Sequence, residues 1–193
     1  NPLGQVDNPG DQEFCNNDNI NINFTTENTG GDTTYSWTNT NSAIGLSNSG
    51  SGNLNITATN TTNDPITSSV TVTPSFEGCE GTPQTFTITV NPTPLIGDIE
   101  QEICTGSGIS ITPTDGTIPS GTIYSWDTPT SLPSGAITGG TSGTDETIIA
   151  ESELLNSTNS PATLTYTVTP TTPDGCTSDP FTISVTVNPL GQV

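Results

Sequence analysis

Residues 86–92 read FTITVNP, and a near-copy, FTISVTVNP, occupies residues 181–189. In both stretches apolar residues alternate with Thr or Ser, so one face of an extended strand is apolar and the other carries hydroxyl groups. β-Branched Thr suits the solvated face of a pleated strand. Both stretches therefore predict β-strands that end at an Asn-Pro step.

The same alternation recurs along the chain, at residues 20–24, 54–58, 70–72 and 164–168. About seven such strands in each stretch of roughly 90 residues, separated by Gly, Pro, Asn and Asp, are typical of an immunoglobulin-like sandwich. Residues 151–156 are expected to form the one helical turn. The sequence thus predicts an all-β chain of tandem immunoglobulin-like sandwiches with about seven strands each.

An internal repeat defines two domains. The segment YSW occurs at residues 35–37 and 124–126, and in both copies its Trp lies 22 residues after a cysteine. We therefore predict one domain over residues 1–90 and a second over 91–187. The hexapeptide NPLGQV opens the chain and recurs at residues 188–193, which predicts the start of a further repeat. Proline at each Asn-Pro step restricts both residues, so we expect stiff, head-to-tail junctions.

The charge excludes several functions. The 193 residues include 20 Asp and Glu but no Lys, Arg or His. Without cations the chain has no electrostatic grip on nucleic acid or anionic lipid. Without His, Ser–His and Cys–His catalysis are excluded, and no apolar run is long enough to insert into a membrane. We expect no enzyme activity.

The cysteines and aromatic residues suggest how each domain is stabilised. Each repeat holds two cysteines, and the pairing that respects the repeat joins Cys15 with Cys79 and Cys104 with Cys176. Each bond would contribute roughly 4 kcal/mol in the chain-entropy treatment; buried free thiols are the alternative. The aromatic residues predicted in the cores are Tyr35, Trp37, Tyr124 and Trp126. The alternative is an exposed aromatic platform for a sugar.

Acidic residues gather at the start of each repeat and suggest calcium as the only metal or cofactor to consider. Asp7, Asp11 and Glu13 precede or begin the first domain's strands, and Asp98, Glu100 and Glu102 take the same place in the second. Calcium binds six to eight hard oxygen ligands, which carboxylates at a junction could supply in part. The alternative is a solvated acidic surface, where we also expect Glu151 and Glu153.

Several motifs resemble those of PKD-like domains. They are EFC at residues 13–15, YSW at 35–37, GC at 78–79 and the closing FTITVNP, with second copies at 102–104, 124–126, 175–176 and 181–189. The usual Gly-Asp-Gly turn after the Trp is absent. Such domains recur in giant surface proteins of Bacteroidetes, including SprB-like gliding adhesins exported by the type IX system. The resemblance implies an extracellular β-sandwich repeat on a cell surface.

Two kinds of glycosylation motif occur. Thr33, in the segment DTT at residues 32–34, resembles a short bacterial O-glycosylation acceptor found in Bacteroidetes. The N-linked acceptor pattern occurs at Asn23, Asn55, Asn60 and Asn156, which we expect to be accidental in a chain so rich in Asn and Thr.

The expected function is mechanical: a spacer repeat of a long extracellular filament, stalk or adhesin, with neighbouring identical repeats as its partners. Two alternatives remain open. One is an adhesive module that binds carbohydrate, such as a surface polysaccharide, and the other is a filament subunit that polymerises noncovalently. Nucleic acid and membrane insertion are not expected.

Overall fold

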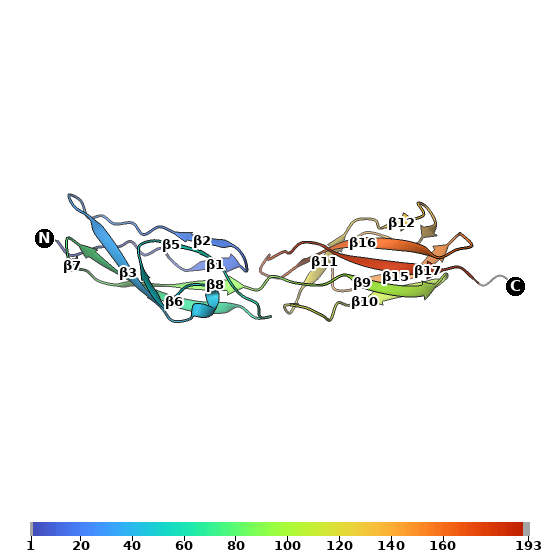
Figure 1. The fold of residues 1–193 in the computed structure, drawn as a ribbon, viewed down its shortest axis with the longest axis horizontal. Coiled ribbons are helices and arrows are strands. Elements are labelled where there is room, and N and C mark those ends of the chain that lie inside the picture. The colour runs from blue at the N-terminus through green and yellow to red at the C-terminus, as the bar shows by residue number, and fades with distance from the viewer. Residues whose placement is uncertain (1, 191–193) are drawn as a thin grey trace. The chain divides into compact units, whose positions relative to one another are not determined.

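The computed structural model describes residues 2–190, whose regular secondary structure is β-strand apart from one short 3₁₀ turn at Ser42–Ile44 (Figure 1). The chain divides into two compact units, Asn1–Pro92 and Thr93–Val193. The boundary thus follows Pro92, two residues beyond the expected one. Of the segment expected to open a further repeat, Asn188 is the last residue of a strand, and residues 191–193 lie outside the described residues.

Unit 1 consists of a large and a small sheet. Its strands are β1 (Gln12–Cys15), β2 (Asn19–Ile22), β3 (Thr33–Asn39), β4 (Ser49–Ser51), β5 (Leu54–Thr57), β6 (Ile66–Phe76), β7 (Cys79–Glu80) and β8 (Gln84–Asn91). The large sheet has the order β1-β8-β6-β3-β4, with β7 paired to β6, and the small sheet is β2-β5. Ile20 and Leu54 of the small sheet pack in one buried cluster with Val72 and Ile88 of the large sheet. The core therefore lies between the two sheets, as in a sandwich.

Unit 2 repeats this plan. Its strands are β9 (Ile99–Cys104), β10 (Ser107–Ile111), β11 (Ile123–Trp126), β12 (Thr130–Leu132), β13 (Ile137–Thr138), β14 (Gly143–Glu146), β15 (Ile149–Asn156), β16 (Ala162–Thr171) and β17 (Phe181–Asn188). The large sheet has the order β14-β11-β16-β17-β9, with β12 paired to β16, and the small sheet is β10-β15-β13. The predicted all-β tandem sandwich fold is confirmed.

In each unit the first strand pairs with the last, and the two strands are parallel. β1 pairs with β8 over four positions, from Gln12 opposite Ile88 to Cys15 opposite Asn91. β9 pairs with β17 over six positions, from Ile99 opposite Ile183 to Cys104 opposite Asn188. The other strand pairs are antiparallel. The chain therefore enters each large sheet at one end of this pair and leaves it at the other.

The predicted helical turn at residues 151–156 is wrong, because these residues belong to β15. The register of β15 against β10 shifts between Glu151 and Leu154, which leaves an extra residue in β15. Glu151 and Leu154 are consequently both buried, while Ser152 and Glu153 between them are exposed. A β-bulge thus produces an i, i+3 spacing of inward-facing residues, which imitates the period of a helix.

Two of the Asn-x-Thr motifs prove to be structural. The side chain of Asn60 donates from Nδ2 to the carbonyl oxygens of Val90 (2.7 Å) and Asp64 (2.9 Å). Its Oδ1 accepts from the backbone N–H (2.9 Å) and the hydroxyl (2.8 Å) of Thr62. Asn60 is only 1% exposed. The motif therefore closes a turn and ties it to β8.

Unit 2 reproduces this arrangement with Asn156. Its Nδ2 donates to the carbonyl oxygens of Val187 (2.7 Å) and Ser160 (2.8 Å), and its Oδ1 accepts both bonds of Thr158 (2.8 Å each). Both asparagines are buried, so in the folded chain neither side-chain amide is accessible to a glycosylating enzyme.

Asn60→Ala should lower the free energy of unfolding of unit 1 by about 1–3 kcal/mol, because it leaves the buried Val90 carbonyl oxygen without this donor and removes the bonds that close the turn. Chemical denaturation followed by intrinsic fluorescence measures this. The matched control is Asn55→Ala, at the exposed asparagine of another Asn-x-Thr motif in the same unit, which should change stability by less than about 0.5 kcal/mol. Equal effects of the two substitutions would contradict the structural role of Asn60.

Candidate functional site

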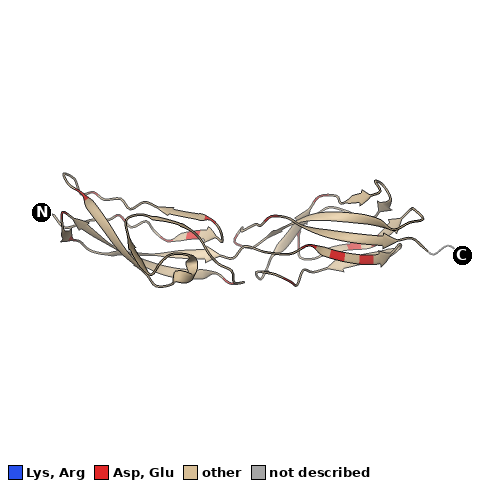
Figure 2. Cartoon of the chain, viewed as in Figure 1, with Lys and Arg blue, Asp and Glu red and all other residues tan. Residues whose placement is uncertain are grey.

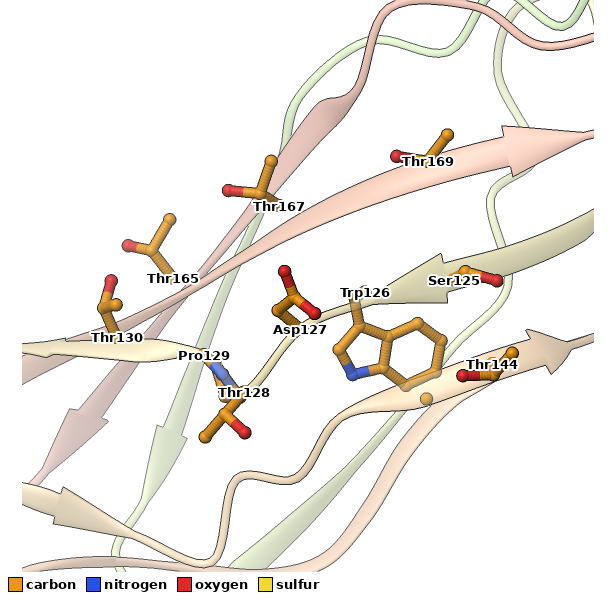
Figure 3. Close-up of a pocket in the computed structure, with 11 residues that line it drawn as sticks. Ser125, Trp126, Asp127, Thr128, Pro129, Thr130, Thr144, Thr165, Thr167 and Thr169 are labelled. Carbon is orange, nitrogen blue, oxygen red and sulfur yellow. The ribbon is translucent and has the colours of Figure 1, made fainter.

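A shallow hollow in unit 2, with a volume of about 460 Å³, opens over the outer face of the large sheet (Figure 3). The residues that line it are Ser125, Trp126, Asp127, Thr128, Pro129, Thr130, Gly143, Thr144, Thr165, Thr167 and Thr169. Thr165, Thr167 and Thr169 occupy alternate positions of β16 and so share one face of the strand. Hydroxyl groups and the carboxylate of Asp127 therefore dominate its chemistry.

Trp126 is the one aromatic residue lining this hollow, and it does not present an open ring face. It is 7% exposed, and its Nε1 donates to the carbonyl oxygen of Thr141 (2.8 Å). The backbone of Gly143 covers the indole so closely that a Cβ atom there would collide with the ring. The glycine is required because any larger residue would have to displace the Trp.

Unit 1 has the same hollow, of about 300 Å³, over the corresponding strands. Trp37 lies under Gly50 there, as Trp126 lies under Gly143, and Thr71 and Thr73 of β6 take the places of the β16 threonines. The Nε1 atom of Trp37 is buried and has no hydrogen-bond partner among the described residues. Since both units form the hollow, it belongs to the plan of the repeat rather than to one specialised domain.

The four aromatic residues singled out from the sequence lie in or against the two cores. Trp37, Tyr124 and Trp126 are 9%, 3% and 7% exposed, and Tyr35 is half-buried against the core of unit 1. Burial raises the pKa of both Tyr35 and Tyr124. The alternative prediction of an exposed aromatic platform does not fit these positions.

Glu151, expected on the surface, is buried, with 8% of the residue exposed. Its carboxylate accepts the backbone N–H of Thr141 (2.7 Å), the Thr141 hydroxyl (3.1 and 3.2 Å) and the hydroxyl of Tyr166 (3.2 Å). Burial, followed by the negative charge of Glu151, raises the pKa of Tyr166 well above its ordinary value. Through Thr141, which also accepts the indole N–H of Trp126, this carboxylate joins β15 to the large sheet. The β-bulge concealed Glu151 from sequence reasoning.

Four of the six acidic residues predicted as calcium ligands accept hydrogen bonds from other parts of their own unit. Asp11 accepts the backbone N–H of Thr87 (2.7 Å), and Asp98 accepts that of Thr182 (2.7 Å). These bonds lower the pKa of both carboxyl groups. Because the folded pKa is lowered, the stabilisation is present above the ordinary pKa and is lost as the pH falls through the lowered one.

The other four acids are spread out. Asp7 accepts the Thr25 hydroxyl (2.7 Å), Glu102 accepts the side-chain amide of Asn188 (2.6 Å), and Glu13 and Glu100 are exposed on β1 and β9. Figure 2 shows acidic residues scattered over both units, with red bands on β9. Within residues 2–190 no three His, Cys, Asp or Glu side chains form a group that could hold a metal ion. Calcium binding stays a prediction, which the melting temperature with calcium or EDTA would test.

The predicted pairing of Cys15 with Cys79 is wrong. Cys79 is a free thiol, whereas Cys15 is disulfide-bonded. Cys15 is level with Asn91, beside the β6 end at Ile66, while Cys79 pairs with Phe76 at the opposite end of β6. The 11 residues of β6 span about 33 Å, whereas the Cα atoms of a disulfide lie within about 7 Å.

The predicted pairing of Cys104 with Cys176 is wrong for the same reason. Cys104 is a free, exposed thiol and Cys176 is disulfide-bonded and fully buried. Cys104 pairs with Asn188, which lies near the first residue of β16. The backbone carbonyl of Cys176 accepts the N–H of Thr172, which directly follows the last residue of β16. The ten residues of β16 again separate the two by about 30 Å.

Thr33 is a poor match for a glycosylation acceptor in the folded chain. It is the first residue of β3, and its hydroxyl oxygen is buried without a hydrogen-bond partner. Modification of Thr33 stays a prediction, and in this conformation it would require the oxygen to become exposed. Of the N-linked acceptor positions, Asn23 and Asn55 are exposed.

Comparison with known proteins assigns the family. The model of the PKD-like domain matches residues 12–94 and again residues 101–191. The chain belongs to the PKD-like domain family. The two matches correspond to the two units, and this PKD-like pair has no match among curated proteins. Residues 2–190 contain no helix long and apolar enough to cross a bilayer.

Several solved structures resemble the PKD-like pair at low similarity. Human protocadherin-24 EC1-2 is 13% identical with a TM-score of 0.43, covering 99% of this chain and 100% of that one. The fibronectin(III)-like modules of Clostridium thermocellum CbhA are 13% identical with a TM-score of 0.33, covering 99% and 98%. The Bacteroides ovatus SGBP-B, in complex with a mixed-linkage heptasaccharide, is 13% identical with a TM-score of 0.33. The match covers 95% of this chain and 48% of SGBP-B, so the chain spans about half its length.

Glu151→Ala should destabilise unit 2 by about 2–4 kcal/mol, because it leaves the buried Tyr166 hydroxyl and the partly buried Thr141 N–H without this acceptor. The control is Glu153→Ala, which removes an exposed carboxylate from the same strand and should change stability by less than about 0.5 kcal/mol. Differential scanning calorimetry measures both. If the two variants melt alike, Glu151 does not tie the sheets together.

Proposed function

We propose that this PKD-like pair is a spacer segment of a long extracellular filament, stalk or adhesin, which holds its shape under tension. The proposal includes a bacterial cell-surface location and a parent protein similar to SprB-like gliding adhesins. It is supported by two copies of one domain plan in a chain without His, Lys or Arg, and by disulfide-bonded cysteines, which persist in oxidising compartments. PKD-like domains are typically non-catalytic modules, in line with this role.

The parallel pairing of the first and last strands is the observation that carries the proposal. When the two ends of a unit are pulled apart, β9 is drawn toward its N-terminus and β17 toward its C-terminus. Two parallel strands loaded in this way slide along one another, so their hydrogen bonds bear the force together. An antiparallel terminal pair would instead open one bond at a time. The β1–β8 and β9–β17 ladders are thus placed to resist tension.

The donors of the β9–β17 ladder can be assigned from its end. The backbone N–H of Thr105 donates to the carbonyl oxygen of Asn188 (2.8 Å). Since successive N–H groups of a strand point in opposite directions, those of Ile103 and Gln101 also face β17, while those of Glu102 and Glu100 face away. Unit 1 has the matching bond, from the N–H of Asn16 to the carbonyl oxygen of Asn91 (2.9 Å).

The uniform negative charge also suits a spacer. A formal charge of −20 with no cation makes neighbouring chains repel one another and discourages pairing between exposed sheet edges. The exposed Glu100 and Glu102 lie on β9, which is an edge strand of its sheet. The absence of Lys and Arg also leaves no site for trypsin-like proteases.

Gln101→Pro tests the mechanical role. Proline removes the N–H that faces β17, so unit 2 should unfold about five- to tenfold faster under constant force, as expected for one lost hydrogen bond. Single-molecule force spectroscopy on the chain held at its two ends, with its disulfide reduced so that β9 carries the load, measures this rate.

The matched control is Glu100→Pro, because the N–H of Glu100 faces away from β17 and an edge strand tolerates proline there. The control should unfold at nearly the wild-type rate. If both variants, or neither, unfold faster under load, the terminal-strand ladder does not bear the force.

A further inference from the structure

The four cysteines mark the two ends of each unit. The end of a unit at which its last strand finishes is called the trailing end. Cys15 and Cys104 lie there, opposite Asn91 and Asn188, the final residues of β8 and β17. Cys79 and Cys176 lie at the other, leading end. There the Cys79 carbonyl oxygen accepts the backbone N–H of Gly4 (3.0 Å), near the start of unit 1.

Cys176 occupies the corresponding place in unit 2. It follows β16 and precedes β17, and its backbone is bonded to Thr172, next to the last residue of β16. That end of the sheet is also where Asp98, just before β9, accepts the N–H of Thr182. Each unit thus carries one leading-end and one trailing-end cysteine at equivalent positions.

Equivalent cysteines differ in oxidation state. At the trailing end, Cys15 is disulfide-bonded and its counterpart Cys104 is a free thiol. At the leading end, Cys176 is disulfide-bonded and its counterpart Cys79 is a free thiol. The fold of the repeat can therefore accommodate a disulfide at either end. The trailing-end cysteine is disulfide-bonded in unit 1, and the leading-end cysteine is disulfide-bonded in unit 2.

The two free thiols are also accessible. Cys104 is exposed at the end of the edge strand β9, and Cys79 is partly exposed in the short hairpin between β6 and β7. They lie at opposite ends of different units, where residues of another repeat could approach them.

We propose that Cys79 and Cys104 form disulfides with cysteines of neighbouring repeats outside this pair. Cys104 bonds to the leading-end cysteine of a following repeat, and Cys79 bonds to the trailing-end cysteine of a preceding one. The pair is thereby cross-linked to the repeat before it and to the repeat after it, in addition to its peptide connections. This inference depends on the proposed spacer role only in that it requires neighbouring repeats.

Each cross-link forms by oxidation of two thiols. The thiolate of one cysteine attacks a small disulfide such as oxidised glutathione and releases one reduced glutathione. The second cysteine's thiolate then attacks the protein sulfur of this mixed disulfide and releases another. The two thiols lose two protons and two electrons in total, and the glutathione disulfide accepts the electrons.

A tandem protein tests the proposal. Because residues 188–193 repeat residues 1–6, joining residues 1–187 to a second copy of residues 1–193 preserves the sequence across the join. With four cysteines in each copy, the tandem has eight. After equilibration with oxidised and reduced glutathione, we expect two free thiols, and a disulfide between Cys104 of the first copy and Cys79 of the second.

Thiol titration and mass spectrometry of a glutamyl-endopeptidase digest read out the pairing. Cys104→Ser in the first copy should raise the number of free thiols from two to three. Four free thiols in the unsubstituted tandem, or cross-links between other cysteines, would overturn the proposal. The spacer role would not fall with it, since the force measurements on Gln101→Pro test that role separately.

A second measurement needs only chains of the original length. The Cys79→Ser variant, labelled uniformly with heavy nitrogen, and the unlabelled Cys104→Ser variant are oxidised separately and as an equal mixture, and dimers are resolved by mass spectrometry under non-reducing conditions. Random pairing in the equal mixture would make half of all dimers contain one chain of each variant. We expect these mixed dimers, in which Cys79 bonds to Cys104, to make up well over half. If each variant alone forms dimers as readily as the mixture does, the proposed pairing of leading-end with trailing-end cysteines is wrong.

Discussion

The parallel pairing of the first strand with the last is the constraint on which the structure depends. It places the points where the chain enters and leaves each sandwich at opposite ends of the large sheet. The length of β6 or β16 then separates the two cysteines of each unit by about 30 Å or more. The same geometry that loads the terminal hydrogen bonds together under tension therefore makes a disulfide within the unit impossible and directs the cysteines toward other repeats.

A chain without cations must satisfy its carboxylates and amides by other means. Backbone N–H groups and hydroxyls serve as the donors instead. Asp11 and Asp98 each accept one backbone N–H at equivalent positions of the two units. Glu151 accepts one backbone N–H and two hydroxyl groups inside unit 2. Asn60 and Asn156 likewise hold equivalent turns with the same four bonds. The abundance of Thr and Asn is thus used structurally as well as on the solvated strand faces.

Local pattern was enough to predict the strands, the repeat and the burial of the Trp residues, because alternation with a period of two directly reports which side chains face the core. Local pattern did not predict features that depend on the register between strands distant in the sequence. The cysteine pairing depends on which end of an 11-residue strand each cysteine reaches, and Glu151 is buried because of a bulge that the partner strand imposes. The Asn-x-Thr motif at Asn60 looked accidental until the carbonyl oxygen of Val90, thirty residues away, proved to be its partner.

Amide hydrogen exchange in β9, followed residue by residue by NMR, tests the terminal-strand pairing most directly. The pairing predicts alternation: the amides of Gln101 and Ile103 should exchange at least about 100-fold more slowly than those of Glu100 and Glu102, whose N–H groups face solvent. Uniformly fast exchange along β9, or equal protection of all four amides, would contradict the parallel pairing of the first and last strands.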